Sequence, residues 1–122
     1  MFGRDSQRDA AELVVLSLLA DGPKYGYLLS KEAAGKSEGA VRLTPGVLYP
    51  LLKALEEKKL VSATWEEVKA ADAEAGEAGR SRKWYRLTAK GKKRFEQSVA
   101  AHRAYRAVMD AFLGGGEKEA SS

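Results

Sequence analysis

Basic side chains are concentrated in one short stretch of the sequence. Eight lysines and arginines lie between Arg80 and Arg94 with no acidic residue among them, although the net charge of the whole chain is only +4. Clustered positive charge binds the phosphates of nucleic acids, and it is also common as a solvated basic surface. Both interpretations fit the charge alone, so the choice between them depends on the elements that carry these residues.

Residues for catalysis or metal binding are scarce. The sequence has no cysteine and a single histidine, His102, with no cluster of acidic residues at ligand spacing around it. Zinc sites need several thiolate, imidazole or carboxylate ligands. The neighbouring carboxylates Glu56 and Glu57 are typical of a solvated surface, and the serines lack a partner base. We therefore expect no enzyme activity, no metal and no cofactor.

The composition is that of one small globular domain with an additional element. The chain has 122 residues, of which 44% are hydrophobic. That is enough for one modest core, and chains of this size often gain stability by oligomerising. The sequence contains no apolar run long enough for a membrane span, and its first residues do not resemble a secretory signal. Together with the lack of cysteine, this favours a cytoplasmic protein without a membrane partner.

Hydrophobic spacing predicts two helices in the first third of the chain. Residues 1–5 are expected to form a mobile arm, with Ser6 as the N-cap of a helix over residues 7–20. This helix is apolar around most of its circumference, which predicts burial on more than one side, including a side supplied by another subunit. A Gly-Pro break separates it from a second helix over residues 24–34, and residues 41–43 have the pattern of a short strand.

The third predicted helix has the clearest signal. Thr44 is a favourable N-cap residue, and Pro45 suits the first helical position. Leucines then recur at i, i+3, i+4 and i+7, which predicts an amphipathic helix over residues 45–59. A hairpin follows over residues 60–87, with Trp65 and Trp84 expected in the core rather than in a ligand site.

The last predicted helix covers residues 89–113, and a disordered tail is expected over residues 114–122. Such a helix would extend roughly 37 Å at 1.5 Å per residue, more than a domain this small can cover. Its apolar stripe therefore predicts a partner helix in a homodimer. The expected dimer interface combines this stripe with the first helix: Leu13, Leu16, Phe95, Val99, His102, Tyr105, Met109 and Phe112.

The order of three helices, a hairpin and a long helix predicts a mainly α (α+β) fold, a winged helix-turn-helix over residues 1–88 followed by a dimerisation helix. In such domains the third helix enters the major groove of double-stranded DNA, and the hairpin, or wing, contacts the backbone or the minor groove. The expected DNA-binding residues are Lys24, Tyr25, Thr44, Pro45, Gly46, Val47, Tyr49, Lys53, Arg80, Arg82 and Lys83.

Base readout is expected from the outward positions of the third helix, Val47, Tyr49 and Lys53. Tyr49 has two possible roles, packing against the first turn of its helix or a hydroxyl contact to DNA, and we favour the contact.

Three stretches resemble the PadR family of transcriptional regulators. Residues 18–28, LLADGPKYGYL, are similar to the family's LL-x-x-GP-x-x-GY-x-L segment. Residues 43–52, LTPGVLYPLL, followed by Leu55-Glu56, are similar to SPGTLYPAL-x-x-LE, which is the most specific of the three. Residues 80–91, RSRKWYRLTAKG, are similar to GRPRKYYRLT-x-x-G. Their order and spacing, over residues 10–95, identify a resemblance to the family's short class, which has one helix after the wing.

The resemblance implies a repressor that binds a two-fold operator as a homodimer and is released by a small molecule. An aromatic effector would then bind at the dimer interface, because the chain has no second domain to hold it. Short members that bind planar drugs use a tryptophan on the last helix, which this helix lacks. The wing loop is lengthened by residues 68–79, and its acidic residues predict that it points away from DNA or is disordered.

Two other classes of function are weighed against this hypothesis. A winged helix can serve as a protein–protein interaction module without DNA binding, in which case the basic run would contact an acidic partner. A small enzyme is the third class, and no residue pattern favours it.

Overall fold

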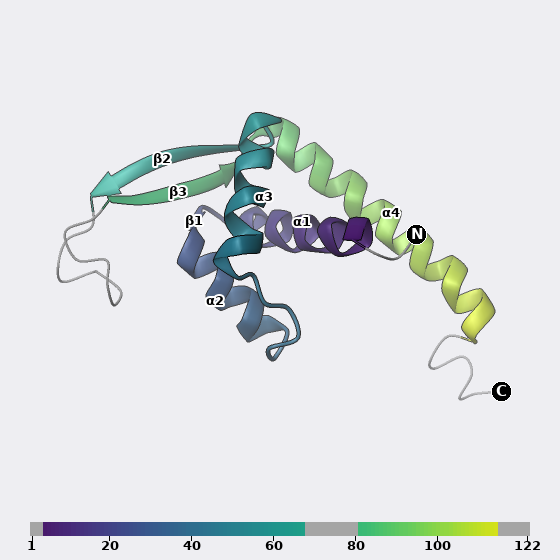
Figure 1. Ribbon diagram of the computed structural model, residues 1–122. Coiled ribbons are helices and arrows are strands. Elements are labelled where there is room, and N and C mark those ends of the chain that lie inside the picture. The colour runs from purple at the N-terminus through teal and green to yellow at the C-terminus, as the bar shows by residue number, and fades with distance from the viewer. Residues whose placement is uncertain (1–3, 68–80, 115–122) are drawn as a thin grey trace.

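The computed structural model describes residues 4–67 and 81–114, and it has the predicted winged-helix fold. Four helices accompany a small antiparallel sheet (Figure 1). The elements are α1 (Arg4–Ala20), β1 (Lys24–Tyr25), α2 (Gly26–Lys36), α3 (Pro45–Glu57), β2 (Val61–Glu67), β3 (Ser81–Leu87) and α4 (Ala89–Leu113). The predicted wing loop (68–79), residues 1–3 of the predicted arm (1–5) and all but Gly114 of the predicted tail (114–122) lie outside the described residues.

The third strand of the sheet is not where the sequence pattern predicted it. Residues 24 and 25 form β1 instead of opening a helix, and they pair with Tyr85 and Trp84 of β3 in a sheet of order β1-β3-β2. Residues 41–43 form no strand, because serine side chains bind their backbone. The Ser37 hydroxyl accepts from the amide of Val41 at 2.8 Å, and the Ser30 hydroxyl donates to the carbonyl of Leu43 at 2.6 Å.

Helix α1 contacts several other elements of the chain and begins earlier than predicted. It starts at Arg4, so Ser6 lies within the helix and is not its N-cap. Contacts with α2, β3 and α4 of the same chain bury much of its apolar circumference, and a further contribution from another subunit stays a prediction. The residues that these elements bury are Val15, Leu16, Leu18 and Leu19.

The end of α3 is set by backbone geometry. Lys59 has a positive φ of 62°, and the amide of Leu60 donates to the carbonyl of Leu55 at 2.9 Å. Together with the bond from the Lys59 amide to the Glu56 carbonyl, this is a Schellman motif. Helix α3 therefore ends at Glu57, two residues before the predicted end, and the chain turns directly into β2.

Helix α4 has the predicted bounds, and its start is joined to the end of α3. The Thr88 hydroxyl accepts from the amide of Gly91 at 2.9 Å and donates to the carbonyl of Lys59 at 2.7 Å. A Cβ on Gly91 would lie 1.9 Å from the carbonyl oxygen of Leu60, so only glycine fits here. These contacts fix where α4 leaves the domain.

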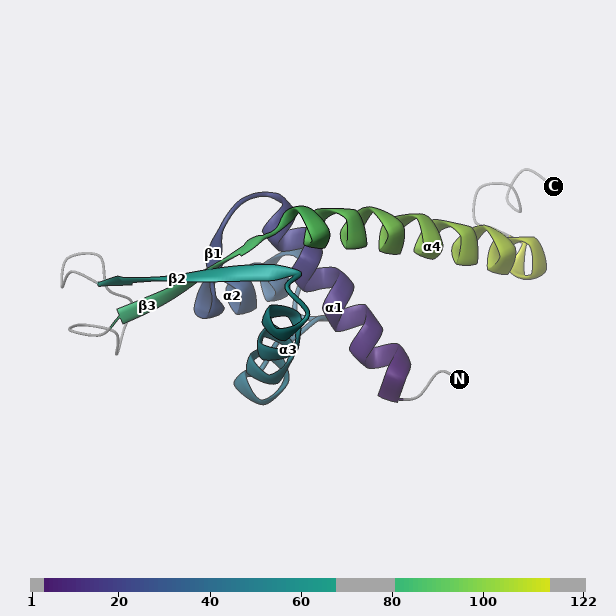
Figure 2. The same ribbon diagram turned by 90° about the horizontal axis from the view of Figure 1, so that it is seen from above.

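The two ends of the molecule project in opposite directions. The β2–β3 ribbon extends to one side, and the second half of α4 extends beyond all the other described elements on the other (Figures 1 and 2). Trp65 near the tip of β2 is 67% exposed, so its predicted place in the core is wrong. Among the described helices, none is both long and apolar enough to cross a membrane.

Candidate nucleic-acid interface

Helix α3 has a buried leucine face and an opposite face that is exposed to solvent. Leu48, Leu52 and Leu55 are buried in the core, which fixes the rotation of the helix about its axis. The opposite face is open to solvent, as the sequence predicted. The exposed residues on it include Gly46, Val47, Tyr49 and Lys53.

The N-terminus of α3 is accessible. Thr44 precedes the helix in an extended conformation, but its side chain makes no capping hydrogen bond. Thr44, Pro45 and Gly46 are all exposed, and a Cβ built on Gly46 meets nothing within 4 Å. Helix N-termini carry unpaired amides and partial positive charge, which favour an anion such as phosphate.

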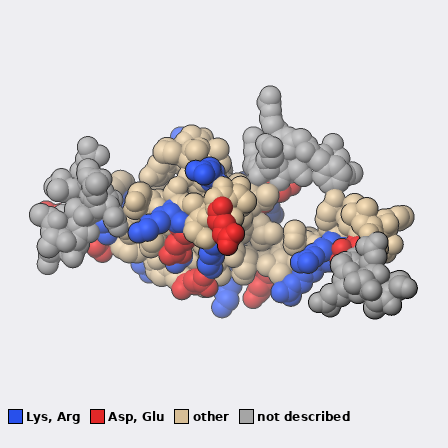
Figure 3. All heavy atoms as spheres, turned by 90° about the horizontal axis from the view of Figure 1, so that it is seen from below, with Lys and Arg blue, Asp and Glu red and all other residues tan. Residues whose placement is uncertain are grey.

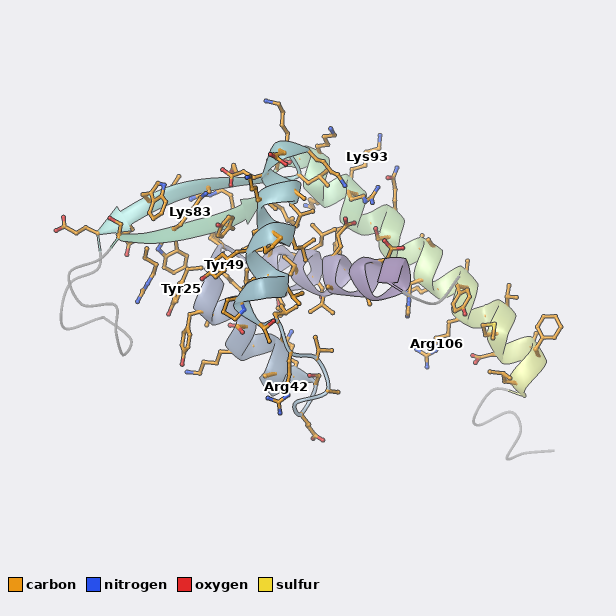
Figure 4. All side chains as sticks on the ribbon, in the orientation of Figure 1. Tyr25, Arg42, Tyr49, Lys83, Lys93 and Arg106 are labelled. Carbon is orange, nitrogen blue, oxygen red and sulfur yellow. The ribbon has the colours of Figure 1, made fainter. Side chains whose placement is uncertain are left out.

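Arg42 is a basic residue near this helix end that the sequence analysis missed. Its side chain is exposed, and no ion pair within the described ranges involves it. In Figure 4 it lies on the loop before α3, below the start of this helix and beside α2. The signal was present, since a basic residue directly precedes the Leu-Thr-Pro start of the helix. It was overlooked because residues 41–43 were assigned to a strand.

Tyr49 packs against the start of α2 and is also open to solvent. Half of the residue is exposed on the outward face of α3. Its ring also lies so close to Gly26 that a Cβ on this glycine would be 2.7 Å from the Tyr49 hydroxyl oxygen. The small residue at the start of α2 thus lets the ring lie flat against the neighbouring helix, and a DNA contact by the hydroxyl stays a prediction.

On the wing, Lys83 is engaged with α3. Its Nζ atom lies 3.1 Å from Oε1 of Glu56, and it is 5.6 Å and 5.4 Å from the ring centres of Trp65 and Tyr85. The hydrogen bond to Glu56 is the main reason why the pKa of Lys83 is raised. Burial raises the pKa of the Tyr85 hydroxyl beside it. The charge of Lys83 is therefore already balanced within the protein.

The other face of the wing carries Arg82. Its guanidinium carbon lies 4.0 Å above the ring centre of Tyr25, and this ring meets Trp84 edge-on at 5.0 Å. Tyr25 is only 8% exposed, and the Lys24 ammonium pairs with Glu32 at 3.1 Å. Burial and pairing argue against the predicted DNA contacts of Tyr25 and Lys24. Arg80 lies outside the described residues.

Charge is mixed over the surface away from the wing. On the face seen from below, lysines and arginines are interspersed with aspartates and glutamates (Figure 3). Tyr25, Tyr49 and Lys83 instead gather beside α3, under the wing, whereas Lys93 and Arg106 lie along α4 (Figure 4). The candidate interface is therefore the outward face of α3 with the adjoining wing.

The residues predicted for a dimer interface fall into two groups. Leu16 is fully buried in its own subunit, and Phe95 packs against the same core, so Leu16 cannot contact a partner and the prediction for it is wrong. Leu13 and His102 line an apolar pocket of about 420 Å³ between α1, α2 and α4. The stripe along α4 continues with Val99, and its outer part includes Tyr105, Met109 and Phe112, the last 82% exposed.

Comparison with protein families gives a match across most of the domain. Residues 15–97 match the model of the transcriptional regulator PadR-like family. An uncharacterized protein of Lysinibacillus sphaericus is 26% identical over 115 residues, which cover 94% of this chain and 98% of that protein.

Solved structures share the fold over nearly the whole chain. A transcriptional regulator from Clostridium thermocellum has a TM-score of 0.75 at 24% identity, covering 93% of this chain and 99% of that one. A PadR family transcriptional regulator from Eggerthella lenta has a TM-score of 0.71 at 26% identity, covering 89% and 86%.

Proposed function

This chain belongs to the PadR-like family of transcriptional regulators, and from that premise we propose that it is a repressor that binds double-stranded operator DNA as a homodimer. In this role α3 is the recognition helix, Val47, Tyr49 and Lys53 read base edges, and the N-terminus of α3 with Arg42 binds phosphate. Arg82 of the wing, and Arg80 beyond the described residues, contribute further positive charge to the DNA backbone.

The outward face of α3 is the observation that supports this proposal most directly. A recognition helix needs one face anchored in the core and another free to enter the major groove. The buried leucines of α3 supply the anchor, and the exposed residues opposite them are a short apolar side chain, a tyrosine and a lysine. These side chains can contact a thymine methyl group, a base edge and a guanine, respectively.

A two-fold operator follows if the second half of α4 pairs with its counterpart. Large apolar side chains there are exposed in the single chain, which favours a symmetric partner. Two recognition helices related by this symmetry would read two half-sites of one palindrome.

The predicted place of a small aromatic effector is the dimer interface, and we assign it to the pocket between α1, α2 and α4 because two residues predicted for that interface, Leu13 and His102, line this pocket. Its lining is mostly apolar, and His102 of α4 contributes to it, so a bound molecule could change how α4 meets the domain and its partner. Planar aromatic compounds that raise the melting temperature of the protein should also release it from DNA, and binders that leave DNA affinity unchanged would exclude an effector role.

Footprinting on the DNA upstream of the protein's own gene tests the main proposal. We expect protection of a palindromic site, with an affinity that falls steeply as salt is added because bound phosphates release counterions. Absence of duplex binding at low salt would contradict the proposal and would favour the alternative, a winged helix that binds an acidic protein partner.

A further inference from the structure

An ion pair connects the wing to the recognition helix partway along the ribbon. Glu56 lies in the last turn of α3, and its Oε1 accepts a hydrogen bond from Lys83 Nζ at 3.1 Å. Lys83 is four residues before the end of β3, roughly 13 Å along the strand at about 3.3 Å per residue. The contact therefore joins a residue partway along the wing to the C-terminal turn of α3.

The surroundings hold the Lys83 side chain in place. The ring of Trp65, its direct partner on β2, and the ring of Tyr85 are both within reach of the ammonium group. Tyr49, Lys53 and Glu57 of α3 line the rest of the open groove between this helix and the wing, about 480 Å³ in volume. Lys83 is 30% exposed and Glu56 is 38% exposed, so the pair is partly shielded from water.

This arrangement is unfavourable for a phosphate contact by Lys83. A phosphate that reached the ammonium group would also approach the carboxylate of Glu56, and the two negative charges would repel each other. The same arrangement is suited to hold two elements together. The opposite charges come from α3 and β3, and the aromatic rings restrict the conformations of the lysine side chain.

We propose that Glu56 is a positioning residue for DNA binding, which holds the wing against the recognition helix through Lys83, and that Lys83 does not contact phosphate. The inference rests on the proposed function, since it concerns the wing and α3 as parts of one DNA-binding surface. A helix and a wing bind one duplex together only at a fixed relative angle, and the ion pair sets this angle before DNA arrives.

The direction in which Glu56→Gln changes operator affinity distinguishes this proposal from one in which Lys83 contacts a phosphate. Removing a negative charge near DNA strengthens binding if electrostatics alone matter. If Glu56 positions the wing, Glu56→Gln should instead weaken operator binding by about three- to tenfold, and Lys83→Gln should do the same. The double variant should bind the operator no more weakly than either single variant. The slope of log affinity against log salt concentration should stay that of the wild type. Fluorescence anisotropy with labelled operator DNA measures all of these quantities.

Two further variants sharpen the test. Glu57→Gln removes the same charge from the same groove at a residue with no ion pair among the described residues, and it should leave binding unchanged or slightly tighter. The exchange Glu56→Lys with Lys83→Glu restores an ion pair at constant net charge, and it should recover most of the lost affinity. Tighter binding by Glu56→Gln, together with a flatter salt slope for Lys83→Gln, would overturn the proposal.

A measurement without DNA distinguishes failure of this inference from failure of the proposed function. Hydrogen exchange of the β2 and β3 amides should accelerate in Glu56→Gln and Lys83→Gln to the same extent, with no further increase in the double variant. Equal protection in all variants would overturn the positioning role even if the wild-type protein binds DNA. If the wild-type protein binds no DNA but amide exchange accelerates equally in the two single variants and the double variant, only the regulatory function is contradicted.

Discussion

Basic residues near α3 differ in whether the protein already balances their charge. Lys83 pairs with Glu56 and Lys24 pairs with Glu32, each at 3.1 Å. Arg42 is exposed and has no such partner among the residues that the structure describes. Since a lysine or arginine gains most from a phosphate when it does not have to leave a carboxylate, we expect Arg42 to bind the DNA backbone more readily than Lys83 or Lys24.

Arg42→Gln should therefore weaken binding to specific and unrelated duplexes by a similar factor. One phosphate contact corresponds to a change of about 0.9 in the slope of log affinity against log salt concentration, and this slope should become shallower by roughly that amount. Titration of labelled duplexes at several salt concentrations measures both effects.

Arg106→Gln is the matched control, since it removes the same charge on α4, away from α3 (Figure 4). Its slope should equal that of the wild type. If both variants change the slope equally, the effect belongs to net charge and Arg42 makes no local contact.

At the scale of elements, the joint between the end of α3 and the start of α4 controls the position of the long helix. Thr88 binds the carbonyl of Lys59, and Gly91 packs against the carbonyl of Leu60 without room for a Cβ. Neither contact depends on DNA or on a second subunit. The joint is therefore a structural requirement of the single chain.

Gly91→Ala should lower the free energy of unfolding by about 3 kcal/mol, near the upper end of the usual cost of overpacking, because the clash is with backbone that cannot rotate away. Urea unfolding followed by circular dichroism measures the loss. Gly35→Ala is the control, since a Cβ on this helical glycine meets nothing within 4 Å. It should stabilise the protein by about 0.5–1 kcal/mol, and a similar loss in both variants would show that the joint is not specially crowded.

The elements that local sequence could predict are those whose ends are set by local contacts. The leucine spacing and the Thr44-Pro45 start located α3, and the Thr88 cap and the glycine after Leu113 located both ends of α4. The end of α3 was missed because Lys59, a residue with no strong preference for positive φ, takes the position that glycine usually occupies.

Non-local contacts explain the remaining errors. The two residues of β1 have no strand pattern of their own, and they are a strand only because β3 lies beside them. Leu16 was assigned to a dimer interface because its burial by α2, β3 and α4 cannot be read from the helix alone. The ion pair of Lys83 was likewise not predictable, since the sequence does not show that Glu56, 27 residues earlier, lies across from it.

In the molecule as a whole, only the first half of α4 packs against the rest of the domain. Its first half packs against α1, where Arg94 also pairs with Glu12 at 3.1 Å. Its second half extends away from the other described elements (Figure 2), and the residue spacing continues the apolar stripe along it. Among the exposed side chains there are Val108, Phe112 and Leu113, and such a surface is costly for an isolated chain.

Met109→Glu tests whether a second copy covers this stripe. A charge in the middle of a helix pairing cannot be buried without a partner, so the variant should be monomeric at micromolar concentrations at which we expect the wild type to be a dimer. Light scattering after size-exclusion chromatography measures the mass. Ala107→Glu adds the same charge on the opposite side of α4 and should leave the dimer intact. A monomeric wild type would contradict the pairing, and equal dissociation by both variants would place the contact elsewhere on α4.

Met109→Glu should also change DNA binding in a specific way. Because Met109 lies on the projecting half of α4, away from α3, the variant should keep the wild-type fold. It should lose affinity for a palindrome far more than for a single half-site.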